Sequence, residues 1–165
     1  MRRWLPPLFL LIVVAAAGFV AVTSSALPER VASHFARGGQ ANGWMPRDAY
    51  TAFVLAPAVV VPLLLVALLA WLARMFPGAI NLPNRAYWFE PERHAATLAS
   101  LAAFAWAFGS VLALLIAGLH WAVVNANART PPILAEAAVD ALLSGFAVAI
   151  AVWILAWYVR FRRPR

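Results

Sequence analysis

The polar stretch that decides the fold spans residues 27–50, LPERVASHFARGGQANGWMPRDAY, between two long apolar runs. Charged and amide side chains are spread along it, and each charge or unpaired backbone group would cost several kcal/mol in hydrocarbon. The stretch must therefore lie in water or at a membrane interface. The pairs Gly38-Gly39 and Asn42-Gly43 predict tight turns within it.

Three apolar side chains are placed to hold this stretch against a bilayer: Pro28, Phe35 and Trp44. Tryptophan is enriched at the level of the lipid headgroups. We therefore expect an ordered loop instead of a flexible tether. We also expect a short interfacial helix from Arg30 to His34.

The composition of the chain requires a lipid solvent. Hydrophobic residues make up 65% of the 165 residues and charged residues only 12%, against about 45–50% and about 25% in an ordinary soluble domain. A small soluble domain leaves too much of its chain exposed to hide this apolar surface. Cysteine is absent, which excludes disulfides, thiolate catalysis and Cys-ligated zinc.

Four apolar runs predict four transmembrane helices, at about residues 4–26, 50–72, 92–124 and 134–159. Each is long enough for the roughly 20 residues that cross a bilayer. The expected fold class is an all-α integral membrane protein, a four-transmembrane-helix bundle in one domain (1–165) with an ordered extracytoplasmic loop after the first helix. A cleaved signal peptide is the alternative for the first run, which exceeds the usual apolar region of about 7–15 residues.

Prolines and small residues mark two of these runs. Pro57 and Pro62 each remove a hydrogen bond from the second helix and predict a kink there. The third run is longer than one span needs, so we expect it to tilt or to project into water. Gly109 and Gly118 within it predict close helix packing.

The distribution of arginine predicts the orientation. All 13 basic residues are Arg; nine (2, 3, 74, 85, 93, 160, 162, 163 and 165) fall on one side of a four-pass arrangement and four (30, 37, 47 and 129) on the other. The positive-inside rule puts the larger group, both termini, loop 74–91 and tail 160–165 in the cytoplasm. Loops 27–49 and 125–133 are then outside the plasma (inner) membrane. The arginines flank apolar runs and form no nucleic-acid motif, so the expected partner is the lipid bilayer and not a nucleic acid.

Two segments together resemble the SdpI-type family of small multi-pass bacterial membrane proteins. The first is Leu27-Pro28 with His34-Phe35, Gly39 and Asn42-Gly43; the second is Asn81-Leu82-Pro83-Asn84 with Tyr87-Trp88 and Glu92-Arg93. The resemblance implies an integral membrane protein of the cell envelope. Named members of the family are immunity proteins against a peptide toxin and membrane signalling partners. This chain has four predicted spans and lacks the additional helices of longer members.

Candidate ligand-binding residues gather on the predicted outer side: His34, Asn42, Trp44, His120 and Asp140. An ionisable group inside a membrane helix is costly and is usually paired or functional. His120 and Asp140 fall at similar predicted depth, so His120 is a candidate partner for Asp140, and Arg129 is the other candidate donor. We expect Asp140 to be the group most sensitive to substitution. The alternatives are a structural His34 bonded to the loop backbone and a solvated carboxylate at a helix start. A zinc site of His34, His120 and Asp140 has suitable ligand types but no ligand-spacing motif.

The second polar stretch contains candidates for docking a cytoplasmic protein. They are Asn81, Asn84, Arg85, Tyr87, Trp88, Glu92 and Arg93. The aromatic pair suits the membrane interface. The alternative interpretation of the charges in this stretch is a solvated cluster without a partner.

No catalytic motif is present: the sequence has no Gly-x-Ser-x-Gly, no His-Glu-x-x-His and no P-loop. We therefore expect a non-enzymatic membrane protein, with no catalytic residue, metal or cofactor. The leading hypothesis is an envelope protein of the ligand-sensing, toxin-sensing or immunity type, which binds an extracellular ligand or toxin on its outer loop and relays its occupancy to the cytoplasmic loop. Its expected partner besides the lipid is an extracellular peptide or a cytoplasmic protein. The alternatives are a small transporter component and a membrane enzyme with a site in the outer leaflet.

Overall fold

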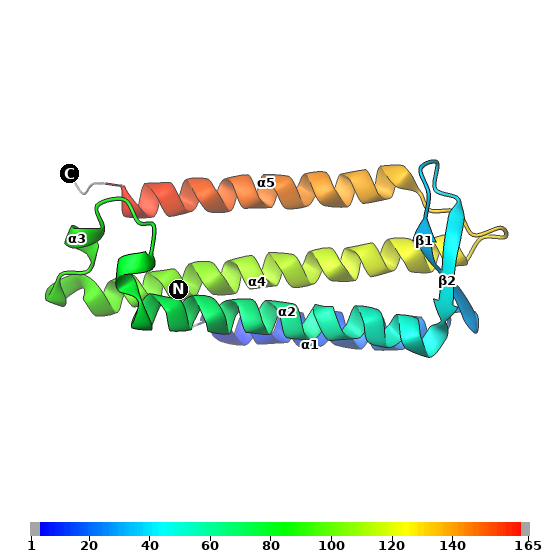
Figure 1. Ribbon diagram of the computed structural model, residues 1–165, viewed down its shortest axis with the longest axis horizontal. Helices are drawn as coiled ribbons and strands as arrows, with labels where there is room; N and C mark the ends of the chain where they lie inside the picture. Colours follow the sequence, from blue (N-terminus) through cyan, green and yellow to red (C-terminus); the bar gives the residue numbers. More distant parts are fainter. Residues whose placement is uncertain (1–3, 163–165) are drawn as a thin grey trace.

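The computed structural model describes residues 4–162, so Arg2, Arg3, Arg163 and Arg165 of the arginine count lie outside the described residues. Within this range four long helices run side by side (Figure 1). They are α1 (Leu5–Ser24), α2 (Arg47–Met75), α4 (Pro91–Asn127) and α5 (Glu136–Phe161), and each is long and apolar enough to cross a membrane. The prediction of an all-α, four-helix membrane fold is confirmed.

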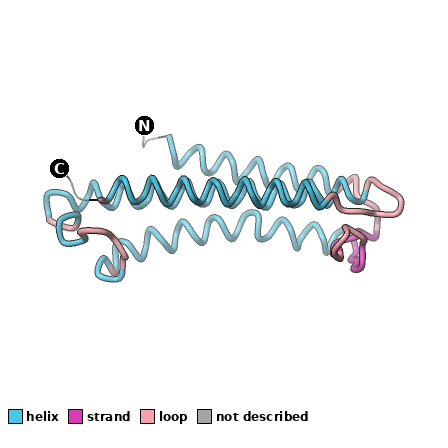
Figure 2. The backbone as a smooth tube through the Cα atoms, turned by 90° about the horizontal axis from the view of Figure 1, so that it is seen from above, coloured by secondary structure: helices cyan, strands magenta, loops and turns pink. Residues whose placement is uncertain are grey.

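The short elements lie at the two ends of the bundle (Figure 2). At one end, called the hairpin end below, β1 (Arg30–Phe35) and β2 (Ala41–Pro46) form a two-stranded antiparallel sheet beside the α4–α5 connection, residues 128–135. At the other end, called the α3 end, lie η2 (Pro77–Ala79), α3 (Arg85–Trp88) and the last turn of α5. The described chain begins and finishes toward this second end (Figure 1).

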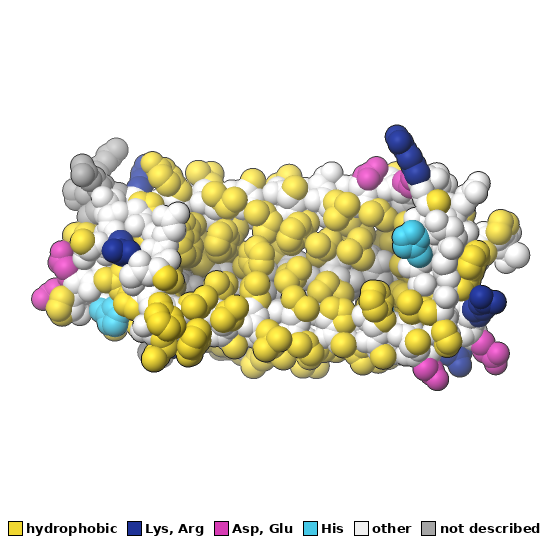
Figure 3. All heavy atoms as spheres, viewed as in Figure 1, with side chains coloured by type: hydrophobic (Ala, Val, Ile, Leu, Met, Phe, Trp, Pro, Cys, Tyr) yellow, Lys and Arg dark blue, Asp and Glu magenta, His cyan; other side chains and the backbone are white. Residues whose placement is uncertain are grey.

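The surface of the bundle has an apolar middle and charged ends (Figure 3). Large apolar side chains in the helices are turned outward: Val14 and Phe53 are each 67% exposed and Leu155 is 62% exposed. A soluble protein rarely exposes so continuous an apolar surface. Hydrocarbon is the solvent that fits it, and the charged side chains at both ends fit the headgroup regions.

Helices α1, α2 and α4 pack closely around an apolar core. Phe9, Val13 and Val66 are buried there against small residues of α4. Gly109 is one of these small residues: a Cβ built on it would lie 2.9 Å from both Phe9 and Val66. The close packing expected at this glycine is confirmed, because a Cβ there would force Phe9 of α1 or Val66 of α2 to shift.

Helix α5 is attached differently. Phe161, in its last turn, is its only buried residue, and Figure 1 shows α5 standing apart from α1 and α2. Along its length α5 packs on α4, where Leu142 reaches Gly118 so closely that a Cβ on this glycine would lie 2.7 Å from the Leu142 Cδ2 atom. Its two ends make further contacts, which are described below.

The expected interfacial helix from Arg30 to His34 is wrong, because these residues belong to strand β1. The physical reason is the turn: Gly38 and Gly39 adopt φ values of 90° and 77°, which are open to glycine and strained for other residues. The chain can thus reverse and pair β1 with β2, which supplies partners for the backbone groups of both strands. The loop is ordered, as predicted, but as a hairpin.

Candidate functional site

The hairpin lies across the end of the bundle, from the last turn of α1 and the first turn of α2 to the start of α5 (Figure 1). Val31 is fully buried in a cluster with Leu27 and Tyr50. Arg47 fixes the base of the hairpin: its guanidinium donates to the Leu27 carbonyl at 3.1 Å, and its backbone N–H donates to the Glu29 carbonyl at 2.9 Å. The base of the hairpin is thus held on α1 and α2.

Asn127, the last residue of α4, holds the middle of strand β1. Its Oδ1 accepts a hydrogen bond from the Ala32 N–H at 2.8 Å, and its Nδ2 donates to the Ala32 carbonyl at 2.9 Å and to the Val123 carbonyl at 2.9 Å. The side-chain amide therefore pairs with Ala32 as a neighbouring strand would. The sequence reading missed this residue, since an asparagine at a helix end is also common without any such role.

The tip of the hairpin is fixed to the start of α5. The Gly38 N–H donates to Glu136 Oε1 at 2.6 Å, and the Leu134 N–H donates to the Gly39 carbonyl at 2.8 Å. Gln40 and Ile133 form an isolated antiparallel bridge. Gly39 is needed for more than its φ, because a Cβ on it would collide with the Leu134 carbonyl.

An open cavity of about 530 Å³ lies between the hairpin tip and the first turns of α5. Arg37 lines it from the hairpin, and Glu136 and Asp140 line it from α5. Phe35 and Val139 supply apolar surface. The cavity therefore offers one cation, two carboxylates and apolar contacts. These groups can bind the polar backbone and a charged side chain of a peptide.

Three of the predicted ligand-binding residues lie on the exposed side of the hairpin. His34 Nδ1 and Asn42 Oδ1 are 2.5 Å apart, so the structure brings these two together across the strands. Gly43 lets the two strands approach at His34, because a Cβ on Gly43 would lie only 2.9 Å from the Cβ of His34. Trp44 is 46% exposed.

The structure does not bring His120 and Asp140 together. His120 is only 2% exposed, with Nε2 2.7 Å from Thr23 Oγ1 and Nδ1 2.9 Å from the Tyr50 hydroxyl. Asp140 is exposed on α5 beside the cavity of the hairpin tip. The face of α4 that carries His120 is turned toward α1 and α2 and away from Asp140. The similar membrane depth predicted for the two residues does not indicate which way each side chain faces.

The hydrogen bonds around His120 define its tautomer. The Thr23 hydroxyl donates its one proton to the Phe19 carbonyl at 2.6 Å, so His120 Nε2–H donates to Thr23 and Nδ1 accepts from Tyr50. The ring also stacks on Tyr50 and meets the edge of Phe19, each at 5.7 Å between centroids. This neutral, satisfied group joins α1, α2 and α4, and it leaves no ring nitrogen for a ligand.

The three residues considered for zinc are not gathered in one place, since His34 and Asp140 are exposed and His120 is buried elsewhere. Within residues 4–162, no group of three or more His, Cys, Asp or Glu side chains is arranged to hold a metal ion. The ligand types that the sequence offered are therefore not assembled into a site.

At the α3 end, several of the predicted docking residues are engaged within the chain. Trp88 Nε1 donates to the Phe161 carbonyl at 2.9 Å. The Arg93 guanidinium lies 3.9 Å from the Tyr87 ring centroid, and it pairs with Glu90 at 2.8 Å. The exposed members of the set are Asn81, Asn84, Arg85 and Glu92. Any docking surface at this end is therefore narrower than the sequence suggested.

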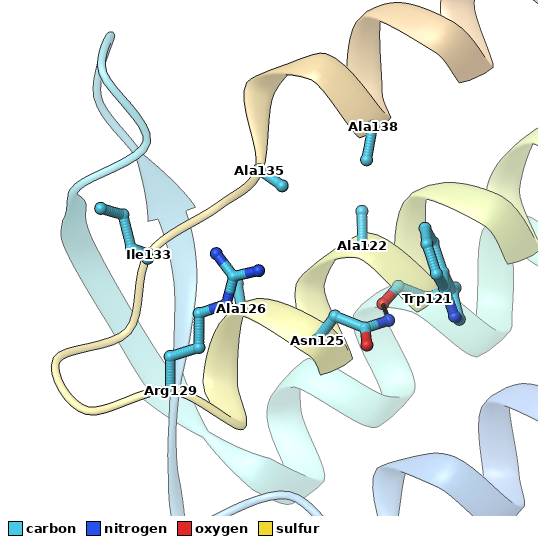
Figure 4. Close-up of a pocket in the computed structure, with 8 residues that line it drawn as sticks. All are labelled: Trp121, Ala122, Asn125, Ala126, Arg129, Ile133, Ala135 and Ala138. Carbon is cyan, nitrogen blue, oxygen red and sulfur yellow. Dashed lines mark hydrogen bonds between the residues drawn. The ribbon is translucent and has the colours of Figure 1, made fainter.

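A second, smaller cavity of about 110 Å³ lies between the end of α4 and the start of α5 (Figure 4). Trp121 and Asn125 of α4 line it together with Arg129 of the α4–α5 connection. Figure 4 shows the guanidinium of Arg129 pointing into this space, and Ala122 and Ala138 facing one another across it. The sequence singled out Arg129 only as a donor for Asp140, and Asp140 does not line this cavity.

Comparison with known proteins gives one match. A family model described as "Domain of unknown function (DUF1648)" matches residues 11–61, which is less than half of the chain and covers most of α1, the hairpin and the first half of α2. This domain is found in small membrane proteins, including SdpI-like ones. No curated protein and no solved structure matches the chain.

Proposed function

We propose that this multi-pass membrane protein is a non-enzymatic receptor that binds an extracellular peptide at the hairpin end and relays its occupancy through α5 to the cytoplasm. One observation carries the proposal: α5 is held at its start by the hairpin tip and at its end by α3, with little burial between. Between its ends α5 packs on α4, through Leu142 at Gly118 and a hydrogen bond from Trp153 Nε1 to the Phe104 carbonyl at 2.9 Å. A change at the hairpin tip therefore acts on a helix that would move only together with these contacts on α4.

The orientation follows from charge. Among the described residues the hairpin end carries four arginines (30, 37, 47 and 129) and the α3 end five (74, 85, 93, 160 and 162). Four more, at positions 2, 3, 163 and 165, adjoin in the sequence the two ends of the described chain, which lie toward the α3 end. We therefore assign the hairpin to the outer side of the plasma membrane by the positive-inside rule. The cavity at the hairpin tip then opens toward the periplasm or medium. Its volume of about 530 Å³ lies within the range of about 300–1,000 Å³ that is usual for ligand sites.

The relay would reach the cytoplasmic side through the last turn of α5. Phe161 is fully buried there in a cluster with Ala73 and Leu82, and Arg160 donates to Ser100 at 3.1 Å. A peptide that binds one position of α5 better than another shifts the equilibrium by that difference in affinity. The bond from Trp88 to the Phe161 carbonyl would pass the shift to α3.

Immunity against a peptide toxin is the form of this function that the family resemblance favours. The matched domain covers the hairpin and the two helices that support it, and named SdpI-type proteins act in this way. In that case the toxin is the extracellular peptide, and it is captured at the hairpin before it enters the bilayer.

The interior of the bundle argues against the transporter alternative. Transport of a polar solute requires a polar path across the membrane. The buried polar side chains among residues 4–162 are Ser24 and His120 near the hairpin end, and Thr97 and Ser100 near the α3 end. The core between them consists of Phe9, Val13 and other apolar residues, so the polar groups do not connect.

Two measurements test the proposal. First, cells without the protein are screened for sensitivity to secreted peptides. Second, the peptide so found is added to purified protein that carries a fluorophore on a single cysteine at Glu92→Cys, near α3. We expect a saturable change in fluorescence. Glu136→Ala, which removes the acceptor of the Gly38 bond, should abolish it.

The matched control is Glu29→Ala. This glutamate is exposed on the same end of the bundle, and its removal changes the net charge by the same amount. It should leave the fluorescence change intact. The proposal fails if no peptide changes the signal, or if both variants reduce it equally.

A further inference from the structure

We propose that the seam between α4 and α5 binds one anionic phospholipid of the leaflet at the hairpin end. Its phosphate lies in the cavity of Figure 4 beside Arg129, and one acyl chain lies in the apolar groove farther along the same seam. This inference does not rest on the proposed receptor function.

The first observation is an unpaired cation over a cavity. Among residues 4–162 no carboxylate lies within ion-pair distance of Arg129, although its guanidinium points into the space between α4 and α5 (Figure 4). Arginine binds phosphate through a planar fork of N–H donors. The carboxamide of Asn125 lines the same cavity and offers a further polar group. The site therefore suits a phosphate.

The second observation is the depth of this cavity in the membrane. Trp121, which lines it, is 47% exposed on α4 two turns before the helix ends. A half-exposed tryptophan at a helix end is typical of the headgroup level. Arg129 follows the last turn of α4 and lies toward the water, as the headgroup of a lipid in this leaflet does.

The third observation is the apolar groove of about 330 Å³ farther along the seam. Leu114 and Leu115 of α4 line one wall, and Ala141, Gly145 and Phe146 of α5 line the other. A Cβ on Gly145 would meet nothing within 4 Å, so the groove is open at this position. A flexible acyl chain fills such a space and makes the contacts that a void would forfeit.

The order of these features along the seam matches one lipid. The polar cavity is lined by Trp121 and Ala138, and the apolar groove by Leu114 and Gly145. Leu142, which also lines the groove, packs on Gly118 at the end of the groove nearer the polar cavity. The chain of the lipid would pass over this contact on its way from the headgroup to the groove. The positive charge of Arg129 selects an anionic headgroup over a zwitterionic one.

The test is native mass spectrometry of the purified chain in detergent, with phosphatidylglycerol, phosphatidylcholine and glycerol 3-phosphate as separate ligands. The wild type should retain phosphatidylglycerol most strongly. Arg129→Gln should lower its affinity about tenfold, as expected for a lost charge-assisted contact, to the level of phosphatidylcholine. Arg30→Gln, an exposed arginine at the same end, is the matched control and should leave the affinity unchanged.

A second pair of variants tests the acyl groove. Gly145→Leu fills it and should lower retention of both phospholipids. Gly18→Leu is the control, because Gly18 is also a helical glycine with open space around a built Cβ. Equal binding of both phospholipids by the wild type would overturn the proposal. So would equal effects within either pair of variants.

Two other occupants are separate outcomes of the same experiment. Glycerol 3-phosphate that displaces phosphatidylglycerol at equal concentration would identify a site for free phosphate esters and overturn the lipid proposal. A protein dimer that forms only when lipid is absent would identify a second copy as the occupant. Lipid retention is measured without any peptide, and the peptide measurements use no lipid-site variant, so the two proposals fail independently.

Discussion

At the scale of single residues, His120 is held by one hydroxyl from each of two other helices. Tyr50→Phe and His120→Gln should therefore be coupled in a double-mutant cycle. We expect a coupling of about 0.6 to 1.7 kcal/mol, the range for polar contacts in membrane bundles. The measurement is the free energy of unfolding in mixed detergent micelles.

The control cycle combines His120→Gln with Asp140→Asn. Because Asp140 is exposed on α5 and His120 is bonded to α1 and α2, these two effects should add within about 0.5 kcal/mol. Coupling in the second cycle, and none in the first, would contradict the arrangement of His120.

Asn127 gives a second prediction at this scale. Asn127→Asp keeps an acceptor for the Ala32 N–H but loses the N–H donors to the Ala32 and Val123 carbonyls. An unpaired buried carbonyl costs about 1–3 kcal/mol, so amide hydrogen exchange in β1 should accelerate about tenfold or more. Asn125→Asp is the control, since Asn125 bonds only within its own helix, to the Trp121 carbonyl.

The sequence indicated which residues are unusual at this scale but not their partners. His120 could be recognised because an ionisable group in an apolar run is costly. Its partners, Thr23 and Tyr50, are common residues near helix ends, and nothing marked them as polar contacts. Pairing depends on which face each helix turns inward, and in a lipid solvent both faces are apolar.

At the scale of elements, the turn of the hairpin distinguishes two neighbouring glycines. Gly39→Ala should release the hairpin tip, because a Cβ meets the Leu134 carbonyl in addition to the strain of φ 77°. Gly38→Ala carries a similar backbone strain, with φ 90°, but meets nothing within 4 Å. Limited proteolysis of the folded protein should cut residues 36–40 faster in Gly39→Ala than in Gly38→Ala. Equal rates would mean that contact with Leu134 does not hold the tip.

The helices were predictable as elements, whereas the hairpin was not. Long apolar runs bounded by Pro and charged residues define a span almost by length alone, and α2 lies at Arg47–Met75 where residues 50–72 were expected. The segment 30–34 has no such signal. Its strand depends on pairing with residues 41–46 across the turn and on the hydrogen bonds from Asn127, which is 95 positions away from Ala32.

At the scale of the whole molecule, the orientation can be tested directly. The chain has no cysteine, so single variants Arg37→Cys and Glu92→Cys can be labelled in intact cells with a membrane-impermeant maleimide. Both positions are exposed, at opposite ends of the bundle. We expect labelling of Arg37→Cys in intact cells and of Glu92→Cys only after lysis. The reverse pattern would overturn the assignment of the hairpin to the outer side.

The unequal attachment of the four helices could not be predicted. The pattern of apolar residues does not indicate which face of a membrane helix packs, since lipid accepts any apolar face. Gly109 and Gly118 were recognised as packing positions, and both are in contact with another helix. That one of them joins the three-helix core and the other the lone α5 is a property of the assembled bundle.

The bond between the hairpin tip and α5 has a consequence for how the protein is made. Glu136 follows Gly38 by 98 positions. At a synthesis rate of about 5–20 residues per second, the hydrogen-bond partner of the tip is therefore made about 5–20 s after the tip itself. All the partners of His120 have already left the ribosome by then. Helices α1 and α2 can therefore pack together in the membrane while the tip still offers the Gly38 N–H and the Gly39 carbonyl to any other strand nearby. The tip is protected once α5 has been made and Glu136 can accept its hydrogen bond. Nascent chains arrested at Asn127 should therefore be cut by protease in the hairpin, whereas the completed chain should resist.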